Sequence, residues 1–329
     1  MKVCIVGAGA IGGFIGTRLA AAGRAEVSAL ARGATLAALR EHGWRLSSGD
    51  TLVRAKAHAS DKPQELGAQD VVIIAVKGPA LTAVAQGIAP LLGSHTLVVP
   101  AMNGVPWWFC NGVPGIDAAP LQSVDPGGVV ARAIPFAQVI GCVVHASTST
   151  PEPGLVLHRM GQGLIVGEPG GGKSERVQSL VELLAHAGFD ATHSANIRYD
   201  IWYKLWGNLT MNPVSAITGA GIDRVLADSL VREFCTAAMR EAAAIGTLLG
   251  CHIEQTPADR HAVTAKLGAF KSSMLQDVQA GRAIELDAIV GAVFEIAQRL
   301  GVQASNIGAL LGLTRLFGRV RGLYPEASN

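Results

Sequence analysis

One stretch of the chain places a cation and two carboxamides at helical spacing. Lys204, Asn208 and Asn212 follow one another at intervals of four residues. In a helix, these three side chains would lie within about 80° of one face. An ammonium group beside two neutral amides packs poorly in an apolar core, but it can hold a small polar molecule and give it a proton. We interpret this stripe as the candidate catalytic centre of an enzyme.

Each residue of the stripe also has a purely structural interpretation. Lys204 could be a solvated charge, although Trp206 and Leu209 give it apolar neighbours in which an idle lysine is uncommon. Asn212 precedes Pro213 and could simply end the helix, because the residue before a proline disfavours the α region.

The amino terminus carries a glycine-rich turn between a strand and a helix. Residues 2–6 predict a buried strand, and residues 13–22 predict a helix of small residues. In this context one glycine forms the tight turn, one lets a pyrophosphate approach the backbone and one permits close packing of helix on strand. We therefore predict that the turn binds a dinucleotide through Gly7, Ala8, Gly9, Ala10, Ile11 and Gly12.

The end of the second strand, expected at 26–30, indicates which dinucleotide binds. A carboxylate there selects NAD, whereas a basic residue favours the 2′-phosphate of NADP. The chain has Arg32 at this position, which predicts NADPH held by a bidentate guanidinium, with an arginine on a solvated turn as the alternative. Lys77 follows another predicted strand and would contact cofactor or substrate, or simply be exposed.

The order of predicted elements divides the chain into two domains. Strands are expected at 2–6, 26–30, 71–76 and 96–99 with helices at 13–22, 34–41 and 80–92, then a loop over 100–135. Short strands at 139–146, 154–158 and 163–166 and a helix ending near 186 follow. Beyond Gly188 we expect no strand, only helices at 195–211, 226–250, 257–280, 284–300 and 306–318. The predicted fold class is α/β: a Rossmann-type doubly wound sheet over 1–190, followed by an all-α domain over 191–329.

Composition limits the partners and the compartment. Apolar residues make up 49% of the chain, charged residues 16%, and the formal net charge is +2, so neither nucleic acid nor an anionic membrane is expected as a partner. Five cysteines lie scattered without a Cys-x-x-Cys pair, which predicts no zinc site, no disulfide framework and a reducing cytoplasm. No metal is predicted. No run of eighteen apolar residues suggests a membrane span.

Two further signatures accompany the lysine stripe. An Asn103-Gly104 turn follows the fourth expected strand, and residues 272–287 read Ser-Ser-Met-Leu-Gln-Asp-Val-Gln-Ala-Gly-Arg-Ala-Ile-Glu-Leu-Asp. Together with the glycine turn and Arg32, these stretches resemble the ketopantoate reductase (2-dehydropantoate 2-reductase) family over nearly the whole chain. The resemblance implies that Lys204 is the general acid and Glu285 its partner. It also implies that the substrate is held by Asn103, Asn208, Asn212 and Ser273, with Asn103 reaching the cofactor too.

The implied reaction is the reduction of a small 2-oxo acid by NADPH in a cleft between the domains, with 2-dehydropantoate to pantoate, a step of pantothenate biosynthesis, as the leading candidate. Hydride addition to the keto carbon develops negative charge on oxygen, which an ammonium stabilises and then protonates. Glu285 would raise the pKa of the lysine and burial would lower it.

Several alternatives stay open at this level. The same mechanism could serve another 2-oxo acid or ketone, and a non-catalytic NADP(H) sensor is a rival from another class. Ser273 and Glu285 could be structural, and we favour a structural role for Asp287. Trp107 and Trp108, in a loop over 105–130, would either roof a pocket or pack the loop onto its domain. The oligomeric state is open, a homodimer included.

Overall fold

The computed structural model describes residues 1–116, 119–266 and 268–326. The chain folds into two compact units. The sheet unit comprises Met1–Asn103 and Gly128–Asp200, and the helical unit comprises Gly104–Gly127 and Ile201–Asn329. The chain thus passes into the helical unit near residue 200, and the predicted loop belongs mostly with the helices. The domain ranges 1–190 and 191–329 themselves stay a prediction.

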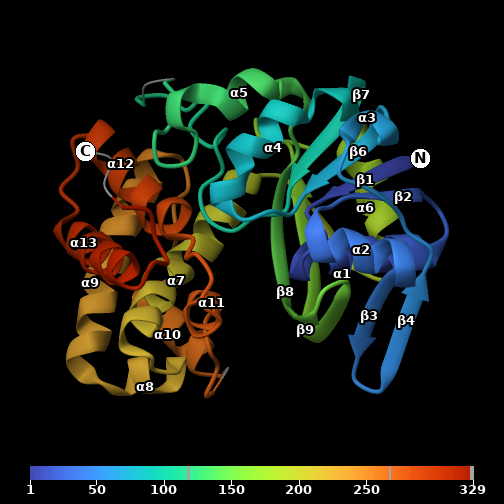
Figure 1. Cartoon of the computed structure of the whole chain (residues 1–329). Helices are drawn as coiled ribbons and strands as arrows, with labels where there is room; N and C mark the ends of the chain where they lie inside the picture. Colours follow the sequence, from blue (N-terminus) through green and yellow to red (C-terminus); the bar gives the residue numbers. More distant parts are fainter. Residues whose placement is uncertain (117–118, 267, 327–329) are drawn as a thin grey trace. The chain divides into compact units, whose positions relative to one another are not determined.

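A parallel sheet of five strands forms the amino-terminal part of the sheet unit (Figure 1). Its strand order is β5 (His58–Ser60), β2 (Glu26–Leu30), β1 (Lys2–Val6), β6 (Gln69–Ile74) and β7 (Leu92–Pro100). The helices of this part are α1 (Ala10–Ala22), α2 (Gly33–His42), α3 (Pro63–Leu66) and α4 (Leu81–Gly87), with 3-10 turns η1 (Gly78–Ala80) and η2 (Ala89–Leu91). The α/β class predicted from alternating strands and helices is confirmed.

A second sheet of five strands completes the sheet unit. It contains β10 (Asp190–Ser194), β9 (Leu155–Gly167), β3 (Trp44–Ser48) and β4 (Thr51–Ala55) in that order, with the long β8 (Gly141–Glu152) antiparallel to β9. Figure 1 shows β8 and β9 as two long green strands. The chain returns to the sheet unit at the end of η3 (Pro126–Gly128), and the remaining helices of this unit are α5 (Val129–Ala133), η4 (Phe136–Gln138) and α6 (Glu175–His186). Helix α1 contacts strands of both sheets, and its Gly16 lies against the ring of Trp44.

This second sheet corrects two expectations. No strand was expected after Gly188, yet β10 pairs in parallel with β9. Its alternating exposed and half-buried pattern carries little apolar signal, so pairing with a neighbour decides the strand. The expected short strands at 139–146, 154–158 and 163–166 are parts of one long β8–β9 hairpin.

The first long helix of the helical unit is α7 (Ile197–Thr218), whose first residues belong to the sheet unit. The helices that follow are α8 (Ile222–Ala227), α9 (Ser229–Leu248), α10 (Pro257–Ala265), α11 (Ser273–Gln279), the π-helical turn η5 (Asp287–Gly291), α12 (Ala292–Arg299) and α13 (Ser305–Val320). Met211, Val214, Cys235 and Leu310 are part of its apolar core. Among the described residues, none of the helices is both long and apolar enough to cross a membrane.

Several expected helices differ from the observed ones. The helix expected at 80–92 is the shorter α4, followed by η2 and by β7 from Leu92. The helix expected at 195–211 continues through Pro213, so the idea that Asn212 ends it is wrong. A proline inside a helix removes one hydrogen bond, but burial of Met211 and Val214 on either side favours the helical path. The helix expected at 257–280 is two helices, with Gly268 in a left-handed conformation between them. The helix expected at 284–300 starts only at 286 and opens with the π-helical turn.

Candidate active site

The carboxyl ends of the central parallel strands lie in register in the sheet unit. Val6 of β1 pairs with Leu30 of β2 and with Ile74 of β6. The amide of Gly7 donates to the carbonyl of Leu30 at 3.0 Å, just beyond the end of β1. The glycine-rich turn therefore begins at the edge of the sheet where ligands of doubly wound folds bind.

Gly7 and Gly12 of the turn are required by sterics, whereas Gly9 is not. Gly7 has φ +90°, a backbone conformation that side chains oppose, and a Cβ there would lie 2.6 Å from Val76 Cγ1. A Cβ on Gly12 would overlap the carbonyl oxygen of Gly7, so only glycine lets α1 approach the turn. Gly9 is exposed and a Cβ there would meet nothing within 4 Å. The backbone is therefore tightly packed at Gly7 and Gly12, whereas the space beside Gly9 is free.

The amino terminus of α1 is suited to an anion. Gly9 caps the helix without a side-chain hydrogen bond, and no acidic residue stands in the first turn. The first amide groups of a helix have no partners within it, and the helix dipole adds positive potential there. The open space at Gly9 and this uncapped terminus fit a pyrophosphate, as the sequence predicts.

The other predicted cofactor residues follow neighbouring strands at the same edge. Arg32 is exposed at the start of α2, two residues beyond β2. Lys77 is half-buried at the start of η1, shortly after β6. Asn103 is half-buried and lies three residues beyond the end of β7. Ala101, the first residue after β7, donates from its amide to the carbonyl of Ile74 at 2.8 Å. The parallel order of the strands therefore gathers all three positions at the edge that carries the glycine turn.

The lysine stripe lies on α7 in the helical unit. Lys204 and Asn208 are half-buried and Asn212 is buried. Two indoles lie on the opposite side of this helix, roughly 160° around the axis from Lys204. Trp202 Nε1 donates to the carbonyl of Ala242 at 3.1 Å and Trp206 Nε1 to that of Met239 at 2.7 Å, both on α9. These hydrogen bonds fix the rotation of α7, so Lys204 lies on the side of the helix opposite to the one that contacts α9.

The structure brings Asn212 and Ser273 together. Asn212 Nδ2 lies 3.5 Å from Ser273 Oγ, at the limit for a hydrogen bond. The neighbouring Ser272 explains how α11 reaches α7: its hydroxyl accepts from the amide of Leu275, capping α11, and donates to Ser215 Oγ at 3.1 Å. A polar contact next to Ser273 thus holds the start of α11 beside the lysine stripe.

Glu285 is half-buried in the irregular segment that precedes η5. Asp287, two residues later, accepts a hydrogen bond of 2.6 Å from the Tyr324 hydroxyl. Burial raises the pKa of Asp287 above its usual value, although Tyr324 and then Arg315 act in the opposite direction. This geometry supports the structural role favoured for Asp287. The pairing of Lys204 with Glu285 stays a prediction.

Arg260, which sequence reasoning did not select, packs against α7. Its guanidinium lies 4.8 Å from the centroid of the Tyr203 ring. A Cβ on Gly207 would lie 2.8 Å from Arg260 Nε, so the glycine makes room for the guanidinium one helical turn after Lys204. A glycine in a helix interior weakens the helix. Gly207 was therefore the one sign in the sequence that another group packs closely against this face of α7.

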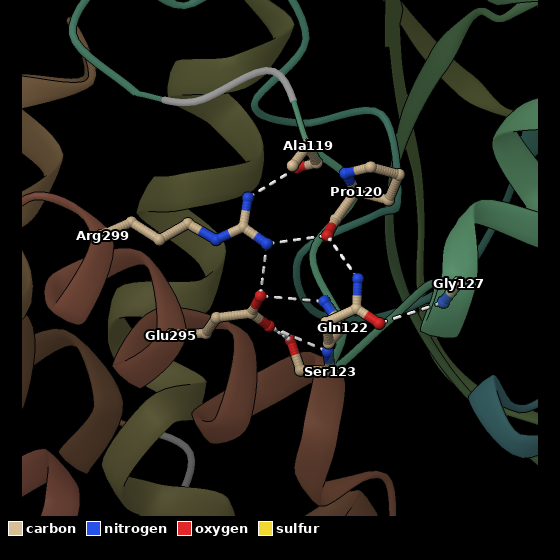
Figure 2. A network of polar contacts seen from close by, with 7 residues as sticks. All are labelled: Ala119, Pro120, Gln122, Ser123, Gly127, Glu295 and Arg299. Atoms are coloured by element: carbon tan, nitrogen blue, oxygen red, sulfur yellow. Dashed lines mark hydrogen bonds and ion pairs between the residues drawn. The ribbon is translucent and has the colours of Figure 1, made fainter.

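The loop after Asn103 is held by residues that the sequence did not reveal, Glu295 and Arg299 of α12. The Glu295 carboxylate accepts hydrogen bonds of 2.8 Å from the amide of Gln122 and from that of Ser123. Figure 2 shows both contacts. Arg299 donates to the carbonyls of Ala119 and Pro120 and pairs with Glu295 at 2.6 Å. Burial opposes ionisation of Glu295, but these hydrogen bonds outweigh it and lower the pKa of the carboxyl.

The aromatic residues of this loop pack within the helical unit. Trp107 and Trp108 are 6% and 2% exposed. The Phe109 ring stacks on Trp202 of α7, with centroids 5.7 Å apart. At the start of the loop, the amide of Val105 donates to the carbonyl of Ala288 in η5 at 2.7 Å. Of the two alternatives for Trp107 and Trp108, their burial favours packing of the loop onto its unit.

Comparisons with known proteins agree with this arrangement. The family model "Ketopantoate reductase PanE/ApbA" matches residues 3–108, and "Ketopantoate reductase PanE/ApbA C terminal" matches residues 196–317. A 2-dehydropantoate 2-reductase of Mesorhizobium japonicum is 43% identical over 98% of this chain and 100% of its own length.

Two solved structures share the whole fold. A Ralstonia solanacearum MolK2 protein assigned as a ketopantoate reductase is 52% identical, with a TM-score of 0.93 over 98% of this chain and 99% of its own. A PanE/ApbA family ketopantoate reductase of Ralstonia eutropha JMP134 is 27% identical, with a TM-score of 0.84 over 98% and 100%. This chain belongs to the ketopantoate reductase family, and it is an oxidoreductase that uses a pyridine nucleotide.

Proposed function

We propose that the chain reduces a small 2-oxo acid with NADPH, and that 2-dehydropantoate, converted to pantoate, is the leading substrate. The relative that is 43% identical over its full length carries the name of that reaction. The observation on which the proposal depends is the orientation of α7, with the indoles of Trp202 and Trp206 bonded to α9 and Lys204 on the other side.

NADPH, when bound, supplies a hydride from C4 of its nicotinamide to the keto carbon of the substrate. We propose that the Lys204 ammonium stabilises the charge that develops on the carbonyl oxygen and transfers one proton to it, which leaves a neutral amine that solvent protonates again. Glu285 is proposed to keep this lysine protonated.

The asparagines and the serine would hold the substrate. An asparagine carries both donors and an acceptor, so Asn208 and Asn212 can bind a carboxylate and a hydroxyl without adding net charge. The contact between Asn212 and Ser273 supports a shared role for these two side chains. Asn103, beyond β7, is proposed to contact both substrate and cofactor.

The choice of NADPH depends on Arg32. Its exposed guanidinium follows β2, at the position where the adenosine ribose of a dinucleotide lies in doubly wound folds. A guanidinium can bind a 2′-phosphate in bidentate fashion. Lys77 is proposed as a further cofactor contact from the end of β6.

We also propose that the enzyme works in the cytoplasm. Among the described residues the five cysteines form no disulfide and all are buried, which fits a reducing compartment. Burial raises the pKa of Cys4 and of Cys235 to about 11, so neither thiol is a reactive nucleophile near neutral pH. We propose a homodimer as the assembly, which sedimentation of the purified chain would test.

The general acid is tested by Lys204→Ala with NADPH oxidation as the readout. We expect kcat with 2-dehydropantoate to fall by about 10²–10⁴-fold, because positioned proton transfer contributes that much. The matched control is Lys266→Ala, which removes an exposed lysine from the end of α10 and should leave kcat unchanged. Turnover within about tenfold of wild type would show that Lys204 is not the acid. A panel with 2-oxoisovalerate and pyruvate identifies the substrate.

A further inference from the structure

The segment that carries Glu285 is bonded to the carboxyl-terminal tail on both sides of that residue. The amide of Ile284 donates to the carbonyl of Leu323 at 3.0 Å. The hydroxyl of Tyr324 donates to Asp287 Oδ1 at 2.6 Å. Two consecutive residues of the tail thus hold the positions one before and two after Glu285.

The tail is itself fixed on the end of α13. The amide of Leu323 donates to the carbonyl of Gly318 at 2.8 Å, and the Leu323 side chain is buried. A Cβ on Gly318 would lie 2.7 Å from Tyr324 Cβ and 3.1 Å from Ile284 Cδ1, so glycine lets tail and segment pack over this helix. The Arg319 guanidinium lies 5.8 Å from the Tyr324 ring centroid. The tail is therefore a firm support for the segment.

The segment needs such support because residues 282–285 lie outside any helix or strand. No regular backbone ladder sets the direction of the Glu285 side chain, so single hydrogen bonds at its ends carry more weight. Burial, followed by the neighbouring Asp287, raises the pKa of Tyr324 above its usual value, and the hydroxyl stays a donor at physiological pH. A half-buried hydroxyl–carboxylate bond of this kind is costly to break.

We propose that Tyr324 is a positioning residue for Glu285. It acts through Asp287, whose carboxylate it holds, and the Leu323 carbonyl secures the other end of the segment. This inference rests on the proposed function, in which Glu285 assists Lys204. The tail would then be part of the catalytic apparatus, although it contributes no group to the reaction.

The test is Tyr324→Phe in the full chain, which removes the hydroxyl and keeps the ring beside Arg319. We expect kcat to fall by about tenfold to a hundredfold, because small misplacements of reacting groups have effects of that size. The dissociation constant for NADPH and the KM for the 2-oxo acid should stay within about twofold of wild type. Asp287→Asn keeps an acceptor for the hydroxyl and should retain kcat, whereas Asp287→Ala should match Tyr324→Phe.

A double-mutant cycle with Glu285→Gln shows whether Tyr324 acts through Glu285. If it does, Tyr324→Phe lowers kcat in the wild-type background but not in the Glu285→Gln background. Additive losses, an unchanged kcat for Tyr324→Phe, or equal losses for Asp287→Asn and Asp287→Ala would each overturn the proposal. Full activity of Glu285→Gln would refute the role of Glu285 in the proposed function, and the inference with it. If Glu285→Gln loses activity but Tyr324→Phe does not, the proposed function stands and only the role of Tyr324 is refuted.

Discussion

At the scale of single residues, the candidate site depends on side chains that orient its residues without themselves contacting a ligand. Lys204 lies on the side of α7 opposite to α9 because Trp202 and Trp206 donate to backbone carbonyls of α9. A buried indole that lost its acceptor would destabilise the helix by about 1–3 kcal/mol. The sequence pattern shows the three polar residues of the stripe, whereas their direction depends on these two hydrogen bonds.

Cofactor choice is also decided by a single residue. We expect Arg32→Ala to weaken NADPH binding by at least about tenfold and to leave NADH binding within about twofold, because only NADPH carries the 2′-phosphate that a guanidinium binds. Fluorescence titration of the purified protein with each nucleotide measures both constants.

The control is Arg24→Ala, which removes an exposed arginine before β2 and should change neither constant. If Arg32→Ala weakened the binding of NADPH and NADH equally, the assignment of the 2′-phosphate to Arg32 would be wrong.

At the scale of elements, the structure assigns residues 104–127 to the helical unit. One end of this loop is bonded to η5 through Val105 and Ala288, and the other end to α12 through Glu295 and Arg299. A long loop needs such attachments because its backbone polar groups have no ladder partners. The sequence marked the loop by its prolines, but nothing in it revealed the pair on α12 as its attachment.

Removing that attachment should loosen the loop without unfolding the protein. We expect Glu295→Ala to lower the free energy of unfolding by about 1–3 kcal/mol, because the amides of Gln122 and Ser123 and the Arg299 guanidinium lose their acceptor. Tryptophan emission should shift to longer wavelength, because a loosened loop exposes Trp107 and Trp108 to solvent. Thermal unfolding and emission spectra check both effects.

Glu182→Ala on α6 provides the comparison, because this exposed glutamate accepts a hydrogen bond from Gln178 of its own helix and its loss should change stability by less than about 0.5 kcal/mol. Equal changes in the two variants would contradict the role of Glu295 as an attachment.

At the scale of the whole molecule, stability should depend on pH through a buried histidine of the helical unit. His261 of α10 is 8% exposed and lies 3.1 Å from Thr236 Oγ1 through Nε2. Burial, and then the charge of Arg232, lower its pKa below the ordinary 6.5. The unfolded chain therefore binds a proton at a higher pH than the folded chain does. The stability that neutral His261 contributes is present above 6.5 and is lost as the pH falls below it.

We accordingly expect wild type to lose thermal stability between pH 7 and pH 5 more steeply than His261→Gln, which cannot be protonated. Calorimetry of both proteins across that range measures the difference. Parallel pH profiles would show that the folded and unfolded states bind a proton at His261 equally well.

The sequence by itself determined the class of the sheet unit and the strands β1, β2, β6 and β7 of its parallel sheet, but it did not predict β3, β4, β5 or β10. Apolar runs such as 2–6 and 71–76 predict a buried parallel sheet. Gly7 and Gly12, between strand and helix, are required by close local contacts. Such features depend on neighbours within a few residues, and periodicity along the chain expresses them. The stripe of Lys204, Asn208 and Asn212 is a local pattern of the same kind.

Only the tertiary structure decided what depends on distant partners. The strand β10 exists because β9 offers it a partner, α7 passes Pro213 because its flanks are buried, and the bond between Tyr324 and Asp287 spans 37 residues. The attachment of the loop to Glu295 spans still more, 172 residues from Ser123. Pattern and propensity carry no information about contacts across such separations, since these form only when packing of the whole unit brings the groups within hydrogen-bond distance.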